Sequence, residues 1–143
     1  MVDSKNVFVD LEINSFDECI DFISKKAFEL GISSDFKQTK DDLLKREKEM
    51  STALLFPLAV PHTKSISINR SDLIFLRLNN YIDWNGEKVK IVISLFSFEK
   101  DYNSHIEMLS KISRKLIDEN FRKSLEVDSK KEIVKNLNKI MKG

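Results

Sequence analysis

The stretch SDLIFLRLNNYIDWNGEKVKIVISLFSF, residues 71–98, decides the fold class of this chain. Residues 71–79 and 88–98 are rich in β-branched and aromatic side chains and therefore predict two strands. Asn85-Gly86 lies between them, and this dipeptide is typical of a type I′ hairpin turn. The centre of the chain is therefore expected to contribute two paired strands to a sheet.

Helices are predicted upstream of this hairpin. VFVDLEI, residues 7–13, alternates as a strand does. Ser15 and Glu18 have the spacing of a capping box, so a helix should begin there. Phe16, Ile20, Ile23, Ala27 and Leu30 then follow at three- and four-residue steps, which indicates one apolar helical face. Gly31 is placed to end this helix, and a second helix is expected after Thr39.

Helices are also predicted downstream. From Asn103 the period becomes helical, and Ile106, Leu109, Ile112, Leu116 and Ile117 are expected on one side. Ser129 and Glu132 repeat the capping spacing before a last helix, whose stripe is Ile133, Leu137 and Ile140. The apolar run 53–60 reads as a buried strand broken by Pro57. This order of elements predicts an α/β fold, a mixed sheet with helices on its faces.

Composition limits the function. The 143 residues suit a single domain over 1–143, and 24 Lys plus Arg against 23 Asp plus Glu give no electrostatic case for nucleic acid or an anionic membrane. The start of the chain lacks the basic-then-apolar pattern of a signal peptide, and the run 53–60 is too short to span a bilayer. We therefore expect a cytoplasmic protein with no nucleic-acid partner and no direct membrane insertion. Cys19 is the one cysteine, so no intramolecular disulfide is expected.

The chemistry must come from few residues. His62 and His105 are the two histidines, and neither lies in a zinc-binding motif. With 3 glycines, the chain has neither a Walker loop nor a dinucleotide-binding pattern. No metal or cofactor is therefore expected.

His62 is the most informative of these residues. It follows a buried apolar run and Pro61, which restricts the backbone on which the imidazole is presented. Such a presentation suits a nucleophile, although the pattern alone favours an ordinary loop histidine. By the same standard, His105 reads as a solvated residue in the first turn of a helix, and Arg46 reads as part of a charged helix face.

A resemblance changes these readings. The segment LLKREKEMSTALLFPLAVPHTKS, residues 43–65, resembles the phosphorylation-site region of the enzyme IIA domain of the fructose–mannitol family, which belongs to the bacterial phosphoenolpyruvate-dependent sugar phosphotransferase system. The matching residues are Arg46-Glu47, Ser51-Thr52 and Ala59-Val60-Pro61-His62. His105 with Leu109, and Phe121-Arg122 with Leu125, are similar to two further elements of the family. The resemblance covers about residues 7–140.

The resemblance implies roles for these residues. His62 would take a phosphoryl group from the histidine-containing phosphocarrier protein and pass it to enzyme IIB, with the membrane enzyme IIC as an indirect partner. His105 and Arg46 would be catalytic residues beside it, and Thr52 would contact the substrate. The enzyme would be a phosphotransferase component with a phosphohistidine intermediate, serving uptake of fructose or a related sugar or hexitol.

Two other functions stay open. One is a regulatory, nitrogen-type IIA paralogue that acts through phosphorylation-dependent protein binding, and the other is an interaction domain that has kept only the fold. Because no IIB or IIC segment is fused to the chain, we expect a separate subunit. The chain departs from the family in 53–58, which has no glycine, so this loop is expected to take a different path.

Overall fold

The computed structural model describes residues 2–142, and within them five strands form one mixed sheet. The strands are β1 (Val7–Leu11), β2 (Leu58–Ala59), β3 (His62–Ser65), β4 (Asp72–Trp84) and β5 (Glu87–Phe98). β4 and β5 are antiparallel, β1 is parallel to β4, and β2 and β3 are both parallel to β5. The sheet therefore has β1 at one edge, and β2 and β3 follow one another along the other edge.

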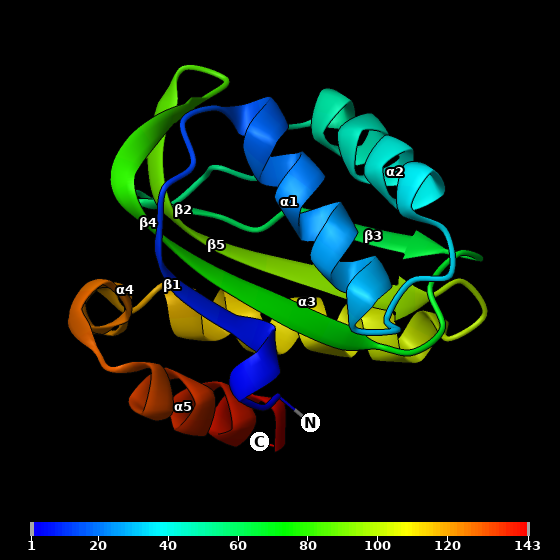
Figure 1. Cartoon of the computed structure of the whole chain (residues 1–143). Coiled ribbons are helices and arrows are strands. Elements are labelled where there is room, and N and C mark those ends of the chain that lie inside the picture. The colour runs from blue at the N-terminus through cyan, green and yellow to red at the C-terminus, as the bar shows by residue number, and fades with distance from the viewer. Residues whose placement is uncertain (1, 143) are drawn as a thin grey trace.

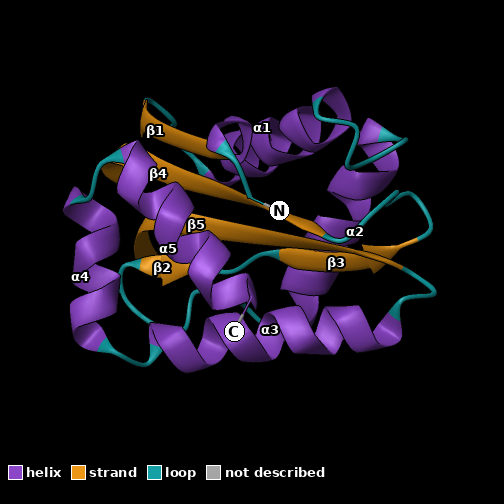
Figure 2. Cartoon of the chain, turned by 90° about the horizontal axis from the view of Figure 1, so that it is seen from below, coloured by secondary structure: helices purple, strands orange, loops and turns teal. Residues whose placement is uncertain are grey.

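Helices cover both faces of this sheet (Figures 1 and 2). α1 (Phe16–Glu29) and α2 (Phe36–Glu49) pack on one face. α3 (Tyr102–Leu116), α4 (Glu119–Val127) and α5 (Lys130–Lys142) pack on the other. A short 3₁₀ helix, Ser4–Asn6, precedes β1. The predicted α/β class, with helices on both faces of a mixed sheet, is confirmed.

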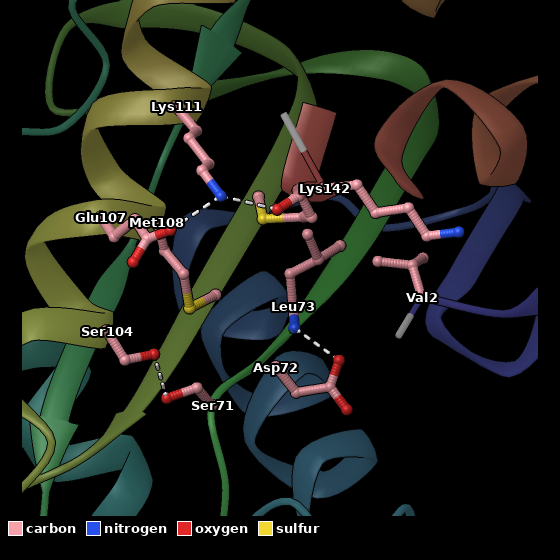
Figure 3. Close-up of a pocket in the computed structure, with 10 residues that line it drawn as sticks. Val2, Ser71, Asp72, Leu73, Ser104, Glu107, Met108, Lys111 and Lys142 are labelled. Atoms are coloured by element: carbon pink, nitrogen blue, oxygen red, sulfur yellow. Dashed lines mark hydrogen bonds and ion pairs between the residues drawn. The ribbon is translucent and has the colours of Figure 1, made fainter. Parts of the chain in front are cut away.

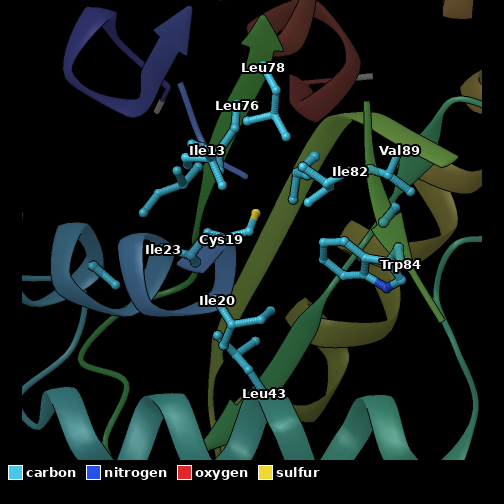
Figure 4. Packing of buried hydrophobic residues seen from close by; sticks show 14 of the residues in the cluster. Ile13, Cys19, Ile20, Ile23, Leu43, Leu76, Leu78, Ile82, Trp84 and Val89 are labelled. Carbon is cyan, nitrogen blue, oxygen red and sulfur yellow. The ribbon is translucent and has the colours of Figure 1, made fainter. Parts of the chain in front are cut away.

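Strand alternation produces two hydrophobic cores. On β4, Ile74 and Leu76 point toward α1 and α2, whereas Leu73 and Phe75 point toward α3, α4 and α5. Figure 4 shows the first core, where Trp84 is fully buried with side chains from α1 and α2. Burying one large apolar side chain contributes roughly 1.5–3 kcal/mol, so the two cores together hold the sheet between its helices.

The predicted helix signals of α1 and α5 are confirmed. The Ser15 hydroxyl accepts the Glu18 backbone N–H at 3.1 Å, and the Ser129 hydroxyl accepts that of Glu132 at 3.2 Å. Gly31 follows α1 with φ of +76°, which a residue with a side chain adopts only with strain. The turn at Asn85-Gly86 is also confirmed, because both residues have positive φ.

The predicted start of the second helix was wrong. α2 begins at Phe36, and the Asp35 side chain caps it by accepting the Gln38 backbone N–H. Thr39 lies inside the helix, fully buried, and its hydroxyl bonds to the Asp35 carbonyl at 2.9 Å. A threonine in this position satisfies its hydroxyl within the helix, so it does not have to interrupt it.

The predicted strand over 53–60 was also largely wrong. Only Leu58–Ala59 pair with β5. Leu54 and Phe56 precede them at 69% and 62% exposure, so the middle of this apolar run, residues 54–56, is a surface loop. Pro57 has no N–H to give to a ladder, although its carbonyl accepts from Lys90 and Ile91. Phe56 instead stacks on Tyr81, with ring centroids 5.7 Å apart.

The predicted apolar face of the third helix was correct only in part. Ile112 and Leu116 are buried, but Ile106 and Ile117 are 47% and 72% exposed. At 100° per residue, Ile106 and Ile117 lie well over 100° around the helix from Ile112, so they cannot share its face. No helix in the range 2–142 has the length and apolar character needed to cross a membrane.

Candidate functional site

Strand β3 presents the His62 side chain. His62 pairs with Leu95 of β5, and because paired residues share a face, its side chain points to the side of the sheet that α3 covers. The ring is half-buried, and its Nδ1 lies 2.8 Å from the Val60 carbonyl oxygen. A carbonyl can only accept, so Nδ1 carries the proton and donates it. The lone pair is therefore on Nε2, as a nucleophile requires.

Helix α3 brings His105 next to His62. Asp101 caps this helix by accepting the Ser104 backbone N–H, which fixes the first turn from which His105 projects. The two imidazole centroids are 5.7 Å apart and the rings are tilted by 47°. His105 Nδ1 lies 3.2 Å from the Ser97 hydroxyl of β5. Two residues that are far apart in the sequence thus meet at one place.

Helix α2 supplies the third side of the site. Arg46 lies in the last turn of α2, where its Nη1 donates to the Met50 carbonyl at 2.8 Å. A surface hollow of about 280 Å³ lies at the β3 edge, between α2 and α3. Its lining residues are Asp42, Lys45, Arg46, Glu49, His62, Thr63, Lys64 and His105. The structure thus brings together Arg46, His62 and His105.

Thr52 is not among the residues that line this hollow. Its backbone N–H and its hydroxyl both donate to the Glu47 carboxylate, which also accepts Trp84 Nε1–H at 3.2 Å. The Thr52 carbonyl in turn accepts the Val60 N–H at 3.3 Å. A substrate contact by Thr52 stays a prediction, while its contacts make it a brace for the chain that leads to His62.

Glu47 is a residue whose importance the sequence reasoning missed. It follows Arg46 in a charged helix segment, yet it joins α2 to the buried Trp84 and to Thr52. A charged helix face does not show which of its carboxylates points inward. The one signal in the sequence was the place of Glu47 next to Arg46 in the matched motif. Glu47 orients the backbone between α2 and β3.

We expect Glu47→Gln to lower the free energy of unfolding by about 1–3 kcal/mol, because an amide has one oxygen and leaves at least one of three donors without its acceptor. Denaturant unfolding followed by Trp84 fluorescence measures this. Asp41→Asn is the matched control, since Asp41 is an exposed carboxylate on the same helix. Equal stability of the two variants would contradict the bracing role.

Electrostatics keep both histidines neutral. Burial lowers the pKa of His62 below its usual value, with a further lowering from Arg46, and the Val60 hydrogen bond and Glu47 oppose it. Burial also lowers the pKa of His105, as do His62, Lys64 and Arg46. A neutral imidazole keeps its nucleophilic lone pair. The site therefore holds its histidines in the reactive form at neutral pH.

The lowered pKa of His62 predicts the pH profile of a reaction at its Nε2. The neutral form stays dominant while the pH falls through 6.5, the usual histidine value, and is lost only below it. The rate of the phosphoryl acceptance that the sequence resemblance implies, measured by intact mass at short times between pH 5 and 8, should therefore be flat above 6.5. A midpoint above 6.5 would contradict the assigned environment.

A second hollow lies elsewhere (Figure 3). It has a volume of about 240 Å³ and lies between α3, the start of β4 and the end of α5, and neither histidine lines it. Its polar groups bond to one another: Lys111 contacts Glu107 and the Met141 carbonyl, and Ser104 contacts Ser71. These contacts are structural. Within 2–142 no cluster of metal-ligating side chains is present.

The fold and the site define a small α/β domain that holds a neutral, oriented histidine at a sheet edge beside a second histidine and an arginine. Residues 1–140 match the family model described as "Phosphoenolpyruvate-dependent sugar phosphotransferase system, EIIA 2". The chain belongs to this family, and the resemblance drawn from the sequence is confirmed.

Curated relatives agree with this assignment. The mannitol-specific phosphotransferase enzyme IIA component of Staphylococcus aureus is 31% identical over 133 residues, which cover 90% of this chain and 88% of that protein. The multiphosphoryl transfer protein of Shigella flexneri is 32% identical over 123 residues, which cover 85% of this chain. The chain matches only 15% of the length of that second relative.

Solved structures share the fold. The nitrogen regulatory protein IIA-Ntr of Neisseria meningitidis matches with a TM-score of 0.85 at 24% identity, over 94% of each chain. Enzyme IIA of the mannitol system of Escherichia coli, in its complex with phosphorylated enzyme IIB, matches with a TM-score of 0.80 at 18% identity. This second match covers 97% of this chain and 98% of the other.

Proposed function

We propose that this chain is a phosphoryl carrier of the sugar phosphotransferase system that uses a phosphohistidine intermediate on His62. The single observation that supports this most is the orientation of His62. Its Nδ1–H is held by the Val60 carbonyl, and its Nε2 is left free beside His105 and Arg46. A histidine kept only for packing needs neither the fixed tautomer nor these neighbours.

The proposed step is a transfer between two imidazoles. The donor is a phosphohistidine of the histidine-containing phosphocarrier protein. The donor ring carries a proton on its other nitrogen, so when its N–P bond breaks and the electron pair stays on the ring, the donor imidazole leaves neutral. A new N–P bond forms from the Nε2 lone pair of His62, whose ring then carries the positive charge. The Nδ1 proton of His62 stays on its nitrogen and keeps its bond to the Val60 carbonyl. Passing the group to enzyme IIB reverses these roles, with a side chain of enzyme IIB as the acceptor.

The surrounding residues suit a group that carries negative charge. Phosphoryl transfer depends mainly on positioning and charge stabilisation. Arg46 presents a guanidinium, which can hold two phosphoryl oxygens at once. His105 is close enough to donate a hydrogen bond to the same group. A protein donor delivers the phosphoryl group, so the proposal includes no metal or cofactor.

Family membership supports the partners of this proposal. The Staphylococcus aureus relative is named as mannitol-specific, and the Escherichia coli structure holds enzyme IIA with phosphorylated enzyme IIB. We therefore propose the phosphocarrier protein and enzyme IIB as direct partners and enzyme IIC as an indirect one. The proposed substrate is fructose or a related sugar or hexitol. This role places the chain in the cytoplasm, as one IIA domain over residues 1–143.

The test of the proposal is a reconstituted relay. The chain is incubated with labelled phosphoenolpyruvate, enzyme I, the phosphocarrier protein and a IIB domain from the same organism. We expect label on this chain first and on the IIB domain afterwards. Label on neither protein, while the phosphocarrier protein is labelled, would overturn the proposal.

The regulatory alternative shares the first step of the relay and differs in the second. We retain this alternative because the nitrogen regulatory protein of Neisseria meningitidis has the same fold. A chain that accepts the label but gives it to no sugar-specific IIB domain would favour regulation. Transfer to a IIB domain would favour transport.

A further inference from the structure

Lys64 occupies a place in β3 that the reaction described above does not use. It lies two residues after His62 on the same strand, so both side chains project from the same face. The pairing of β3 with β5 agrees, because His62 pairs with Leu95 and Lys64 pairs with Ser97, whose hydroxyl contacts His105. Thr63 and Ser65 between and beyond them are buried.

The start of α3 carries two side chains, those of Tyr102 and His105, that face Lys64 and His62 of β3. Tyr102 and His105 are three residues apart, so they lie one turn apart on the same side of the helix. His105 meets His62, and the Tyr102 ring meets Lys64, whose Nζ lies 4.5 Å from the ring centroid. Two neighbouring pairs therefore join β3 to α3, and Tyr102 holds the ammonium group at the rim of the histidine hollow.

Among residues 2–142, the ammonium group of Lys64 has no carboxylate partner. None of the ion pairs within residues 2–142 includes Lys64, although other lysines of the chain form several. Its charge nevertheless reaches His105, because it contributes to the lowered pKa of that residue. An unpaired cation that lines the hollow together with Arg46 is free to take an incoming anion.

We propose that Lys64 is a phosphoryl-binding residue, which Tyr102 positions to pair with the phosphoryl group on His62. The proposal rests on the function proposed above and deepens it. Arg46 reaches the hollow from α2, and Lys64 reaches it from the α3 side, so the two cations meet the phosphoryl group from different directions. No bond to Lys64 is made or broken. Its positive charge balances the negative charge of the phosphoryl group for as long as that group stays on His62.

The experiment compares Lys64→Met with Lys64→Arg and with Lys90→Met. Lys90 is the matched control, because it also lies over a tyrosine ring, that of Tyr81 at 5.4 Å, but does not line the hollow. Two rates are measured with the phosphocarrier protein as donor: acceptance of the phosphoryl group, and loss of the group from the isolated phosphoprotein. The His105 titration, followed by NMR in the unphosphorylated protein, reports the local charge.

We expect Lys64→Met to slow acceptance about tenfold, as for the loss of one charge-assisted contact, and to shorten the life of the phosphoprotein. Lys64→Arg should restore both rates, Lys90→Met should change neither, and the pKa of His105 should rise in Lys64→Met only. Equal rates for wild type and Lys64→Met would overturn this inference and leave the proposed function standing. A wild-type protein that accepts no phosphoryl group would overturn both.

Discussion

His62→Ala is expected to accept no phosphoryl group, while its free energy of unfolding stays within about 1 kcal/mol of wild type. The imidazole is half-buried at a sheet edge, and its hydrogen bond is to the Val60 carbonyl, two residues earlier in the chain. Its removal therefore leaves the two cores intact. Transfer needs a nucleophilic nitrogen, which alanine does not have. Label from phosphoenolpyruvate, after passage through the phosphocarrier protein, measures acceptance.

His62→Gln is the matched variant. Glutamine keeps a polar side chain of similar reach, so the lining of the hollow changes little, yet its amide nitrogen is not a nucleophile. It should be as inactive as alanine. Label retained on either variant would place the phosphoryl group on another residue and would contradict the proposal that His62 carries it.

His105→Ala is expected to slow acceptance about 100-fold, the usual effect of losing one donor that stabilises charge as the transition state forms. The ring of His105 lies next to that of His62, with a centroid separation of 5.7 Å, and its Nδ1 contacts the Ser97 hydroxyl. This contact is a modest one, so the stability change should stay near 1 kcal/mol. Rapid-quench measurement of acceptance, beside denaturant unfolding, separates the two effects.

His105→Gln tests the reason for this loss. A glutamine amide can donate a hydrogen bond toward the same hollow, so it should recover part of the rate that alanine loses. A His105→Ala protein that accepts at the wild-type rate would remove His105 from the site. A variant that loses stability and rate in proportion would show that the residue acts through folding.

Much of the fold could be predicted because its signals are local. Ser15, Gly31 and the Asn85-Gly86 turn act through backbone groups within a few residues, and each was predicted correctly. The errors arose where a distant contact decides. Thr39 is buried within a helix, where its hydroxyl contacts that of Ser67, 28 residues away, at 3.2 Å. The apolar run 53–60 pairs with β5 only at Leu58–Ala59.

The candidate site could be predicted only through the matched motif. Periodicity alone made His62 a loop residue and His105 a solvated one, because the contact between them joins β3 to α3 across the fold. Glu47 was missed for the same reason, since its acceptor role depends on Trp84, which is far away in the sequence. Residue spacing carries no information on such pairings. The meeting of His62 and His105 depends on the register of β3 on β5 and on α3, whose His105 contacts Ser97 of β5.

Intact-mass spectrometry shows directly whether the chain carries a phosphoryl group on His62. The chain is incubated with phosphoenolpyruvate, enzyme I and the phosphocarrier protein of the same organism, and is kept near neutral or basic pH because phosphohistidine is acid-labile. We expect the mass of the wild-type chain to increase by that of one phosphoryl group, and the mass of His62→Ala to stay unchanged. An unchanged mass of the wild-type chain, while the phosphocarrier protein in the same tube is phosphorylated, would contradict this expectation.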